Sequence, residues 1–110
     1  MATRFNQVVG VEALDDLLDQ SRTETVILFN HDPHCPISAR AFSQMEQLDD
    51  EVMLVDVSRE RTLTREIQSR TGVRHESPQV IVFRDGQPAW SASHFQITTE
   101  AVQSATNGDS

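Results

Sequence analysis

The sequence is poor in several residue types that would otherwise suggest a function. Its 110 residues include one cysteine, four glycines and no tyrosine. One cysteine cannot form a disulfide within the chain, and it excludes a metal site built from several thiolates of a single chain. Apolar runs such as VILF and VMLV are four residues long, which is too short to span a bilayer. Because the first residues, MATRFNQVVG, also lack the pattern of an export signal, we expect a cytoplasmic protein under reducing conditions.

Positive charge is scarce as well. The chain has 9 basic residues, all of them arginine, against 17 acidic residues, and its formal net charge is −8. Nucleic acids and anionic membranes are bound through positive surfaces, so we expect neither as a partner. The length suits one domain with a single core, which we assign to residues 1–105, followed by a flexible tail over residues 106–110 (TNGDS).

The spacing of apolar residues predicts helices that alternate with short strands. Strands are expected over residues 25–30, 52–57, 79–84 and 88–94, with a further edge strand over residues 4–8 as an option. Helices are expected over residues 11–20, from 36 to about 49, around 63–72 and from about 98 onward. Helical crossovers make the strands over 25–30 and 52–57 parallel, whereas Asp85-Gly86 indicates an antiparallel hairpin. This order predicts an α/β fold with a mixed four- to five-stranded sheet and helices on both faces.

Local signals locate the ends of these helices. Gly72 is expected to close the third helix, and Thr98 to cap the last one, with Ile97 packing onto Val102. The buried positions of the second helix are expected to be Ile37, Ala41, Met45 and Leu48.

The single cysteine, Cys35, lies in the stretch FNHDPHCPISARAF, after an expected strand and before an expected helix. With Cys35 as the N-cap and Pro36 in the first helical position, the N–H groups of Ile37 and Ser38 point back toward the sulfur. These donors and the helix dipole favour the thiolate over the thiol. The Ser38 hydroxyl, three residues on, can donate a hydrogen bond to the sulfur, and a protonated His34 would stabilise the thiolate further. The stretch therefore predicts a reactive thiol at the start of a helix.

Two other interpretations of Cys35 stay open. A lone cysteine is commonly a small buried hydrophobe, although the polar neighbours Asp32 and His34 argue against that here. A metal site could form from His31, Asp32, His34 and Cys35, but Pro33 and the short loop hinder their convergence, and we predict no metal site. His31 and His34 are more simply explained as loop residues.

The motif Cys35-Pro36-Ile37-Ser38 has the CxxS form, in which serine replaces the second cysteine of the CxxC redox motif. Further on, TGVRHESPQVIVFRDGQPAW resembles the segment of thioredoxins that carries a cis proline beside the catalytic cysteine. Pro78 is the matching residue, although the segment from Gly72 to Pro78 is one residue longer than in ordinary thioredoxins. This resemblance implies a thioredoxin-like fold.

A more specific resemblance covers nearly the whole chain, from about Val26 to Ala105. The combination of HCPISARAF, VDVSR, TGVRHESPQVIVFRDG and WSASHFQIT resembles the monothiol bacilliredoxin family, the YtxJ-like or bacilliredoxin C group. The resemblance implies an enzyme, a thiol–disulfide oxidoreductase whose nucleophile is Cys35. Its implied partners are S-thiolated cytosolic proteins, with bacillithiol or a similar low-molecular-weight thiol as co-substrate and no bound cofactor.

The resemblance also assigns roles around Cys35. The other residues of the CPIS motif would shape the site, with Pro36 at the substrate. Ser77 and Pro78 would present backbone groups to an extended substrate segment. Because the chain has no resolving cysteine, a second low-molecular-weight thiol or a reductase system must regenerate Cys35.

Two functions from other classes stay open. In the first, the protein is a binding module that docks partners through Pro78 and traps them on Cys35 without turnover. In the second, it is an iron–sulfur carrier like some monothiol glutaredoxins, with Cys35 and an exogenous thiol as ligands in a dimer. Those glutaredoxins carry a CGFS motif, whereas proline and isoleucine occupy the middle positions here.

Overall fold

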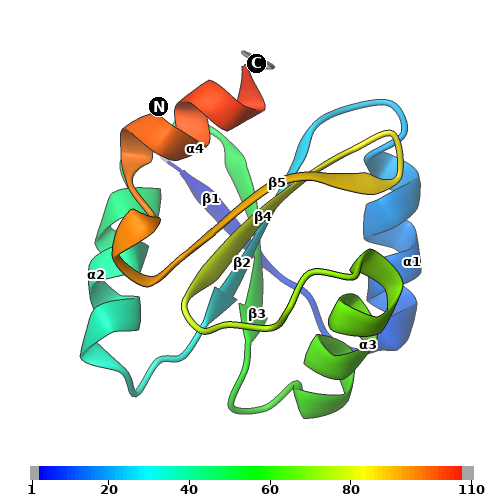
Figure 1. The fold of residues 1–110 in the computed structure, drawn as a ribbon, viewed down its shortest axis with the longest axis horizontal. Helices are drawn as coiled ribbons and strands as arrows, with labels where there is room; N and C mark the ends of the chain where they lie inside the picture. The colour runs from blue at the N-terminus through cyan, green and yellow to red at the C-terminus, as the bar shows by residue number, and fades with distance from the viewer. Residues whose placement is uncertain (1–2, 108–110) are drawn as a thin grey trace.

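Five strands form one mixed sheet in the order β1-β3-β2-β4-β5 (Figure 1). The structure is a computed structural model that describes residues 3–107. Its strands are β1 (Arg4–Gln7), β2 (Val26–His31), β3 (Glu51–Asp56), β4 (Gln79–Arg84) and β5 (Gln87–Ser93). β3 runs parallel to both β1 and β2, whereas β4 is antiparallel to β2 and to β5. The optional edge strand is present, and the predicted pairings are confirmed.

Helices cover both faces of this sheet, as predicted. They are α1 (Val11–Gln20), α2 (Pro36–Met45), α3 (Arg61–Thr71) and α4 (Thr99–Thr106), with a short 3-10 helix, η1 (His94–Gln96), between β5 and α4. Figure 1 shows α2 and α4 on one side of the sheet and α1 and α3 on the other. Each pair of helices closes its own cluster of buried apolar side chains against the strands.

The central position of β2 explains its continuous apolar run, VILF. Ile27 and Phe29 join the cluster beneath α2 and α4, whereas Leu28 joins the cluster beneath α1 and α3. Successive side chains of a strand point to opposite faces, so a strand covered on both sides is apolar throughout. The last residue of β2, His31, follows the same alternation and contacts Phe42 of α2.

Helix α2 is shorter than predicted and buries a different set of side chains. It ends at Met45 rather than near residue 49, and its buried residues are Ser38, Ala41 and Met45. Ile37, which was expected to be buried, is half-exposed, because Ser38 lies one helical turn before Ala41 on the inward face. Leu48 is buried as predicted, but it lies beyond the end of the helix.

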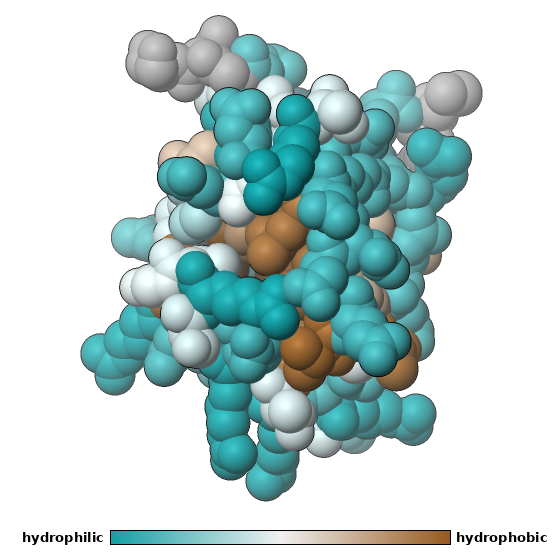
Figure 2. Space-filling view, turned by 90° about the vertical axis from the view of Figure 1, so that its right-hand side faces the viewer, coloured by the Kyte–Doolittle hydropathy of each residue, from teal (hydrophilic) through white to brown (hydrophobic). Residues whose placement is uncertain are grey.

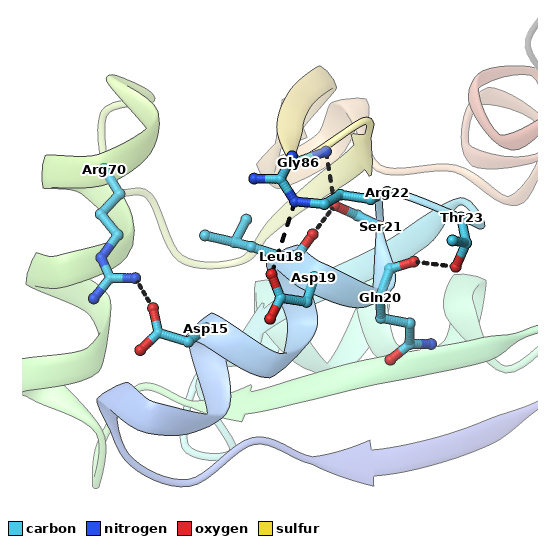
Figure 3. Close-up of polar contacts among 9 residues, drawn as sticks. All are labelled: Asp15, Leu18, Asp19, Gln20, Ser21, Arg22, Thr23, Arg70 and Gly86. Carbon is cyan, nitrogen blue, oxygen red and sulfur yellow. Dashed lines mark hydrogen bonds and ion pairs between the residues drawn. The ribbon is translucent and has the colours of Figure 1, made fainter.

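The turn between β4 and β5 is attached to the end of α1 (Figure 3). Asp85 and Gly86 have φ angles of 55° and 77°, the left-handed conformation that a two-residue hairpin turn needs at both positions. The Asp85 N–H donates to the Ser21 carbonyl at 2.8 Å, and the Gly86 N–H donates to the Ser21 hydroxyl at 3.0 Å. Ser21 Oγ itself donates to the Leu18 carbonyl at 2.6 Å. The predicted hairpin is confirmed, and one serine fixes its turn to the preceding helix.

The helix ends follow the local signals in the sequence. Gly72 closes α3 with a φ of 74°, and the Thr98 hydroxyl accepts a hydrogen bond from the Ala101 N–H at 3.1 Å. β5 ends at Ser93, one residue earlier than predicted, because the φ of His94 is 53° and η1 begins there. α4 includes residue 106, the first of the expected tail, and residues 108–110 of that tail lie outside the described residues.

The surface over α1 and α3 is mainly polar. Figure 2 views the side formed by α1 and α3, where hydrophilic side chains predominate and apolar atoms are visible between them. At the start of β2, a cavity of about 340 Å³ is lined by residues that include Arg4, Val26 and Thr106.

Within residues 3–107, no helix combines the length and the hydrophobicity that a bilayer crossing requires.

Candidate active site around Cys35

Cys35 lies at the N-terminus of α2, in the position that the sequence predicts. Its φ and ψ of −109° and 125° are the extended conformation of an N-cap, and Pro36 is the first helical residue. A tight turn leads to it, because the Cys35 N–H donates to the Asp32 carbonyl at 3.1 Å and the His34 N–H donates to Asp32 Oδ1 at 2.9 Å. The thiol is free and half-buried, so it is accessible to a reaction partner.

The first turn of α2 leaves its donors open around this thiol. No hydrogen bond joins the Cys35 side chain to the helix, and within residues 3–107 the N–H groups of Ile37 and Ser38 have no partner. The first turn also carries no acidic side chain. No side chain of that turn therefore offsets the positive end of the helix dipole.

Ser38 is fully buried, and its hydroxyl contacts two groups of the preceding strand and loop. Ser38 Oγ lies 2.6 Å from His31 Nδ1, and it accepts a hydrogen bond from the Asp32 N–H at 2.9 Å. Among the described residues, the hydroxyl does not form the hydrogen bond to Cys35 that the sequence suggests. Any donation from Ser38 to the sulfur thus competes with His31.

His31 is the residue of this site that sequence reasoning missed. It is the last residue of β2 rather than a loop residue, it pairs with Asp56 of β3, and its carbonyl accepts from the Val57 N–H at 3.0 Å. Its ring lies against Phe29 and Phe42, with centroids 5.2 and 5.1 Å away. Burial lowers the pKa of His31 below the ordinary 6.5, while the carboxylates of Asp56 and Asp32 act in the opposite direction. The alternation of Phe29 and His31 along the strand was the available signal.

His34, in contrast, is exposed, and its backbone rather than its ring holds the turn before Cys35. In the part of the chain that the structure describes, no three side chains of His, Cys, Asp or Glu come together in an arrangement that could hold a metal ion.

Ser77 and Pro78 lie at the same end of the sheet as Cys35. β4 begins at Gln79, which pairs with Asn30, so Pro78 lies beside the end of β2. The Ser77–Pro78 bond is cis, as predicted, and the Pro78 carbonyl accepts from the His94 N–H at 3.0 Å. Neither the N–H nor the C=O of Ser77 has a hydrogen-bond partner within residues 3–107. Of the two residues, Ser77 therefore has backbone groups free to bind another chain.

The loop before Ser77 is held from two sides. The His75 N–H donates to the Gln68 side chain of α3 at 2.7 Å, and Gln79 Nε2 donates to the Arg74 carbonyl at 2.8 Å. Burial also lowers the pKa of His75, against the opposing effect of Glu76. These contacts hold the loop in place.

An exposed aromatic residue lies next to α2. Phe95 of η1 is 62% exposed, and the guanidinium of Arg40 on α2 lies 5.4 Å from its ring centroid. Such a cation–aromatic pair offers a flat apolar surface with a positive charge at one side.

Comparisons with known proteins agree with this geometry. A solved structure of a proposed oxidoreductase with a thioredoxin fold superposes with a TM-score of 0.85, at 27% identity over 92% of each chain. Thioredoxin of Fasciola hepatica gives a TM-score of 0.75 at 12% identity, over 96% of this chain and 99% of its own. A mutant thioredoxin of Halobacterium salinarum gives 0.67 at 22% identity, over 96% and 89%.

The two thioredoxins share the fold, so the thioredoxin-like fold predicted from the sequence is confirmed. The family model described as monothiol bacilliredoxin BrxC matches residues 6–102. The chain belongs to the monothiol bacilliredoxin BrxC family and has the fold of a thioredoxin-like oxidoreductase.

Proposed function

We propose that this protein removes bacillithiol, or a similar low-molecular-weight thiol, from mixed disulfides on cytoplasmic proteins. Membership of the bacilliredoxin family supports the class of reaction. One observation carries the assignment of the nucleophile: the only cysteine of the chain is a free, half-buried thiol at the N-cap of α2.

The reaction is a thiol–disulfide exchange in two steps. The Cys35 thiolate attacks the bacillithiol sulfur of the mixed disulfide, the S–S bond to the substrate protein breaks, and the protein thiolate leaves and takes a proton from water. A second low-molecular-weight thiol then attacks the disulfide on Cys35, which releases a disulfide of two small thiols and restores the Cys35 thiolate. An external thiol is needed because the chain has no other cysteine.

Three groups around Cys35 support these steps. The open N–H groups of Ile37 and Ser38 stabilise the thiolate before the attack. Ser77 binds an extended segment of the substrate protein through its unpaired N–H and C=O, in the manner of an added strand. Pro36, exposed at the start of α2, contacts the same segment.

The test is a transfer experiment with intact mass as the readout. The reduced protein is mixed with a model protein that carries a bacillithiol mixed disulfide and, in parallel, with one that carries glutathione. We expect the mass of bacillithiol to appear on the wild-type protein and not on Cys35→Ser. Transfer of glutathione alone would reassign the thiol, and transfer of neither would contradict the proposal.

The same samples separate an exchange enzyme from a module that traps its partners. Addition of excess bacillithiol should release the small thiol from Cys35 and return the protein to its reduced mass. A covalent complex of the two proteins that persists in excess bacillithiol would favour a trapping module instead.

A further inference from the structure

We propose that His31 is a positioning residue that acts on Cys35 through the hydroxyl of Ser38. This role deepens the exchange function proposed above and rests on it. His31 determines whether the single hydroxyl proton of Ser38 is available to the Cys35 sulfur.

The argument begins with the hydrogen bonds that Ser38 can make. A serine hydroxyl has one proton to donate and two lone pairs that accept. One lone pair accepts the Asp32 N–H at 2.9 Å, and the short contact of 2.6 Å joins Ser38 Oγ to His31 Nδ1. When the imidazole is neutral and Nδ1 accepts, the only proton of Ser38 is donated to His31. No proton is then left for Cys35.

Protonation of His31 reverses this arrangement. Both nitrogens of an imidazolium are donors, so Nδ1 then donates to Ser38 Oγ, which accepts from His31 and from the Asp32 N–H. The Ser38 O–H is then free to donate to another acceptor. Ser38 is the third residue of α2 after its N-cap, Cys35, a spacing at which the two side chains of a helix start approach each other. The acceptor that we propose for this proton is the Cys35 sulfur at the N-cap of the same helix.

The surroundings of His31 make both states accessible. From β3, Asp56 faces it and is itself 3.8 Å from the guanidinium of Arg59, and Asp32 follows it in the chain. From α2, the uncharged side chains of Ser38 and Phe42 contact it, and Pro78 lies on the β4 side. Burial favours the neutral ring near pH 7, whereas the two carboxylates favour the imidazolium as the pH falls.

The consequence is a thiol whose stabilisation depends on pH in an unusual direction. Near neutral pH, the Ser38 O–H donates to His31, and the Cys35 thiolate is stabilised by the helix N–H groups without Ser38. In mild acid, Ser38 is released and helps to retain the thiolate. His34 is adjacent to Cys35 in the sequence, but within residues 3–107 it forms no hydrogen bond with Ser38, so we assign it no part in this control.

The experiment measures the rate at which iodoacetamide alkylates Cys35, from pH 5.5 to pH 8. His31→Phe removes Nδ1 and keeps an aromatic ring between Phe29 and Phe42. We expect this variant to react faster than the wild type at pH 7.5, by up to about tenfold, because one hydrogen bond raises the thiolate population and only partly lowers its nucleophilicity. The ratio of the variant rate to the wild-type rate should decrease toward pH 5.5, because His31 of the wild type is then protonated and no longer accepts the Ser38 proton.

The background of Ser38→Ala isolates the path of the effect. In a protein that already carries Ser38→Ala, His31→Phe should leave the alkylation rate of Cys35 at pH 7.5 unchanged, because there is no Ser38 hydroxyl to donate to the sulfur. His34→Phe is the control variant. Any change in alkylation rate that it causes should be the same in the wild-type background and in Ser38→Ala. His31→Leu repeats the test should the phenylalanine variant unfold, and cooperative urea unfolding verifies each protein.

An unchanged or slower reaction of His31→Phe at pH 7.5, or an acceleration that persists in Ser38→Ala, would overturn the proposal. The assay uses no mixed disulfide, so this outcome would leave the exchange function standing. Conversely, a failure of bacillithiol transfer would not alter the alkylation result.

Discussion

Asn30 and Gln79 face each other across the β2–β4 ladder, where Asn30 Nδ2 donates to Gln79 Oε1 at 3.0 Å. Both side chains are buried, at 0% and 3% exposure. Gln79 Nε2 in turn donates to the carbonyl of Arg74, in the loop that precedes Ser77. Two amides therefore connect the central strands to the loop that precedes Ser77.

Gln79→Leu should lower the free energy of unfolding by about 1–3 kcal/mol, because a buried amide of Asn30 and the Arg74 carbonyl lose their partner. In Asn30→Leu/Gln79→Leu, the part of this loss that comes from the unpaired Asn30 amide should be recovered, because both polar groups of the pair are removed and Asn30 Oδ1 has no partner among the described residues. Urea unfolding of the wild type, Asn30→Leu, Gln79→Leu and the double variant measures this. Losses that simply add in the double variant would contradict the predicted coupling.

Cys35→Ser should fold with nearly wild-type stability, within about 0.5 kcal/mol. The thiol is half-buried and forms no hydrogen bond with the helix that it caps, so its replacement by the similar serine side chain breaks no capping hydrogen bond. Thermal and urea unfolding test this. If the stability is unchanged, a loss of bacillithiol transfer in Cys35→Ser reflects the missing thiol rather than unfolding. A loss above 1 kcal/mol would indicate a structural role for the sulfur.

Two phenylalanines near the site should respond very differently to truncation. Phe29 is completely buried beneath α2, so Phe29→Ala should cost about 3–5 kcal/mol through lost contacts and a residual cavity. Phe95 is mostly exposed, and Phe95→Ala should change the stability by less than about 0.5 kcal/mol. Urea unfolding of the pair gives the comparison; similar losses would mean that Phe95 packs as a core residue in solution.

The stability should decline as the pH falls below about 6.5. The pKa values of His31 and His75 are lowered in the folded state by burial, so the unfolded chain binds more protons between 6.5 and the folded-state values. Unfolding therefore becomes easier as the pH falls through this window, and full stability is present above it. For each histidine the slope is at most about 1.4 kcal/mol per pH unit.

Urea unfolding between pH 7.5 and pH 5 measures this decline, and His31→Phe and His75→Phe should each reduce its slope. A slope equal to that of the wild type in both variants would assign the decline to other groups.

Local chemistry explains which parts of the fold were predictable. Proline after Cys35, Gly72 after α3 and Asp85-Gly86 between two apolar runs each specify one backbone conformation within a few residues, and all three are where the sequence indicates. The length of α2 was less predictable, because Leu48 continues the helical spacing of apolar residues after Met45, although the chain there already turns toward β3.

The site itself was predictable only in part, because its polar contacts join distant segments. The position of Cys35 follows from its neighbours in the chain. The partners of Ser38 depend on how far β2 continues, since one more strand residue turns His31 toward α2. The contact of Asn30 with Gln79 spans 49 positions and has no signal in either local stretch.

The cavity at the start of β2 has a practical consequence for handling the protein. Arg4 of β1 and Thr106 of α4 both line it, whereas Cys35 follows the opposite end of the same strand. Six residues of extended chain separate the two ends by about 20 Å. A dye, a reporter protein or a sensor surface attached through β1 or α4 would thus leave the thiol facing solution.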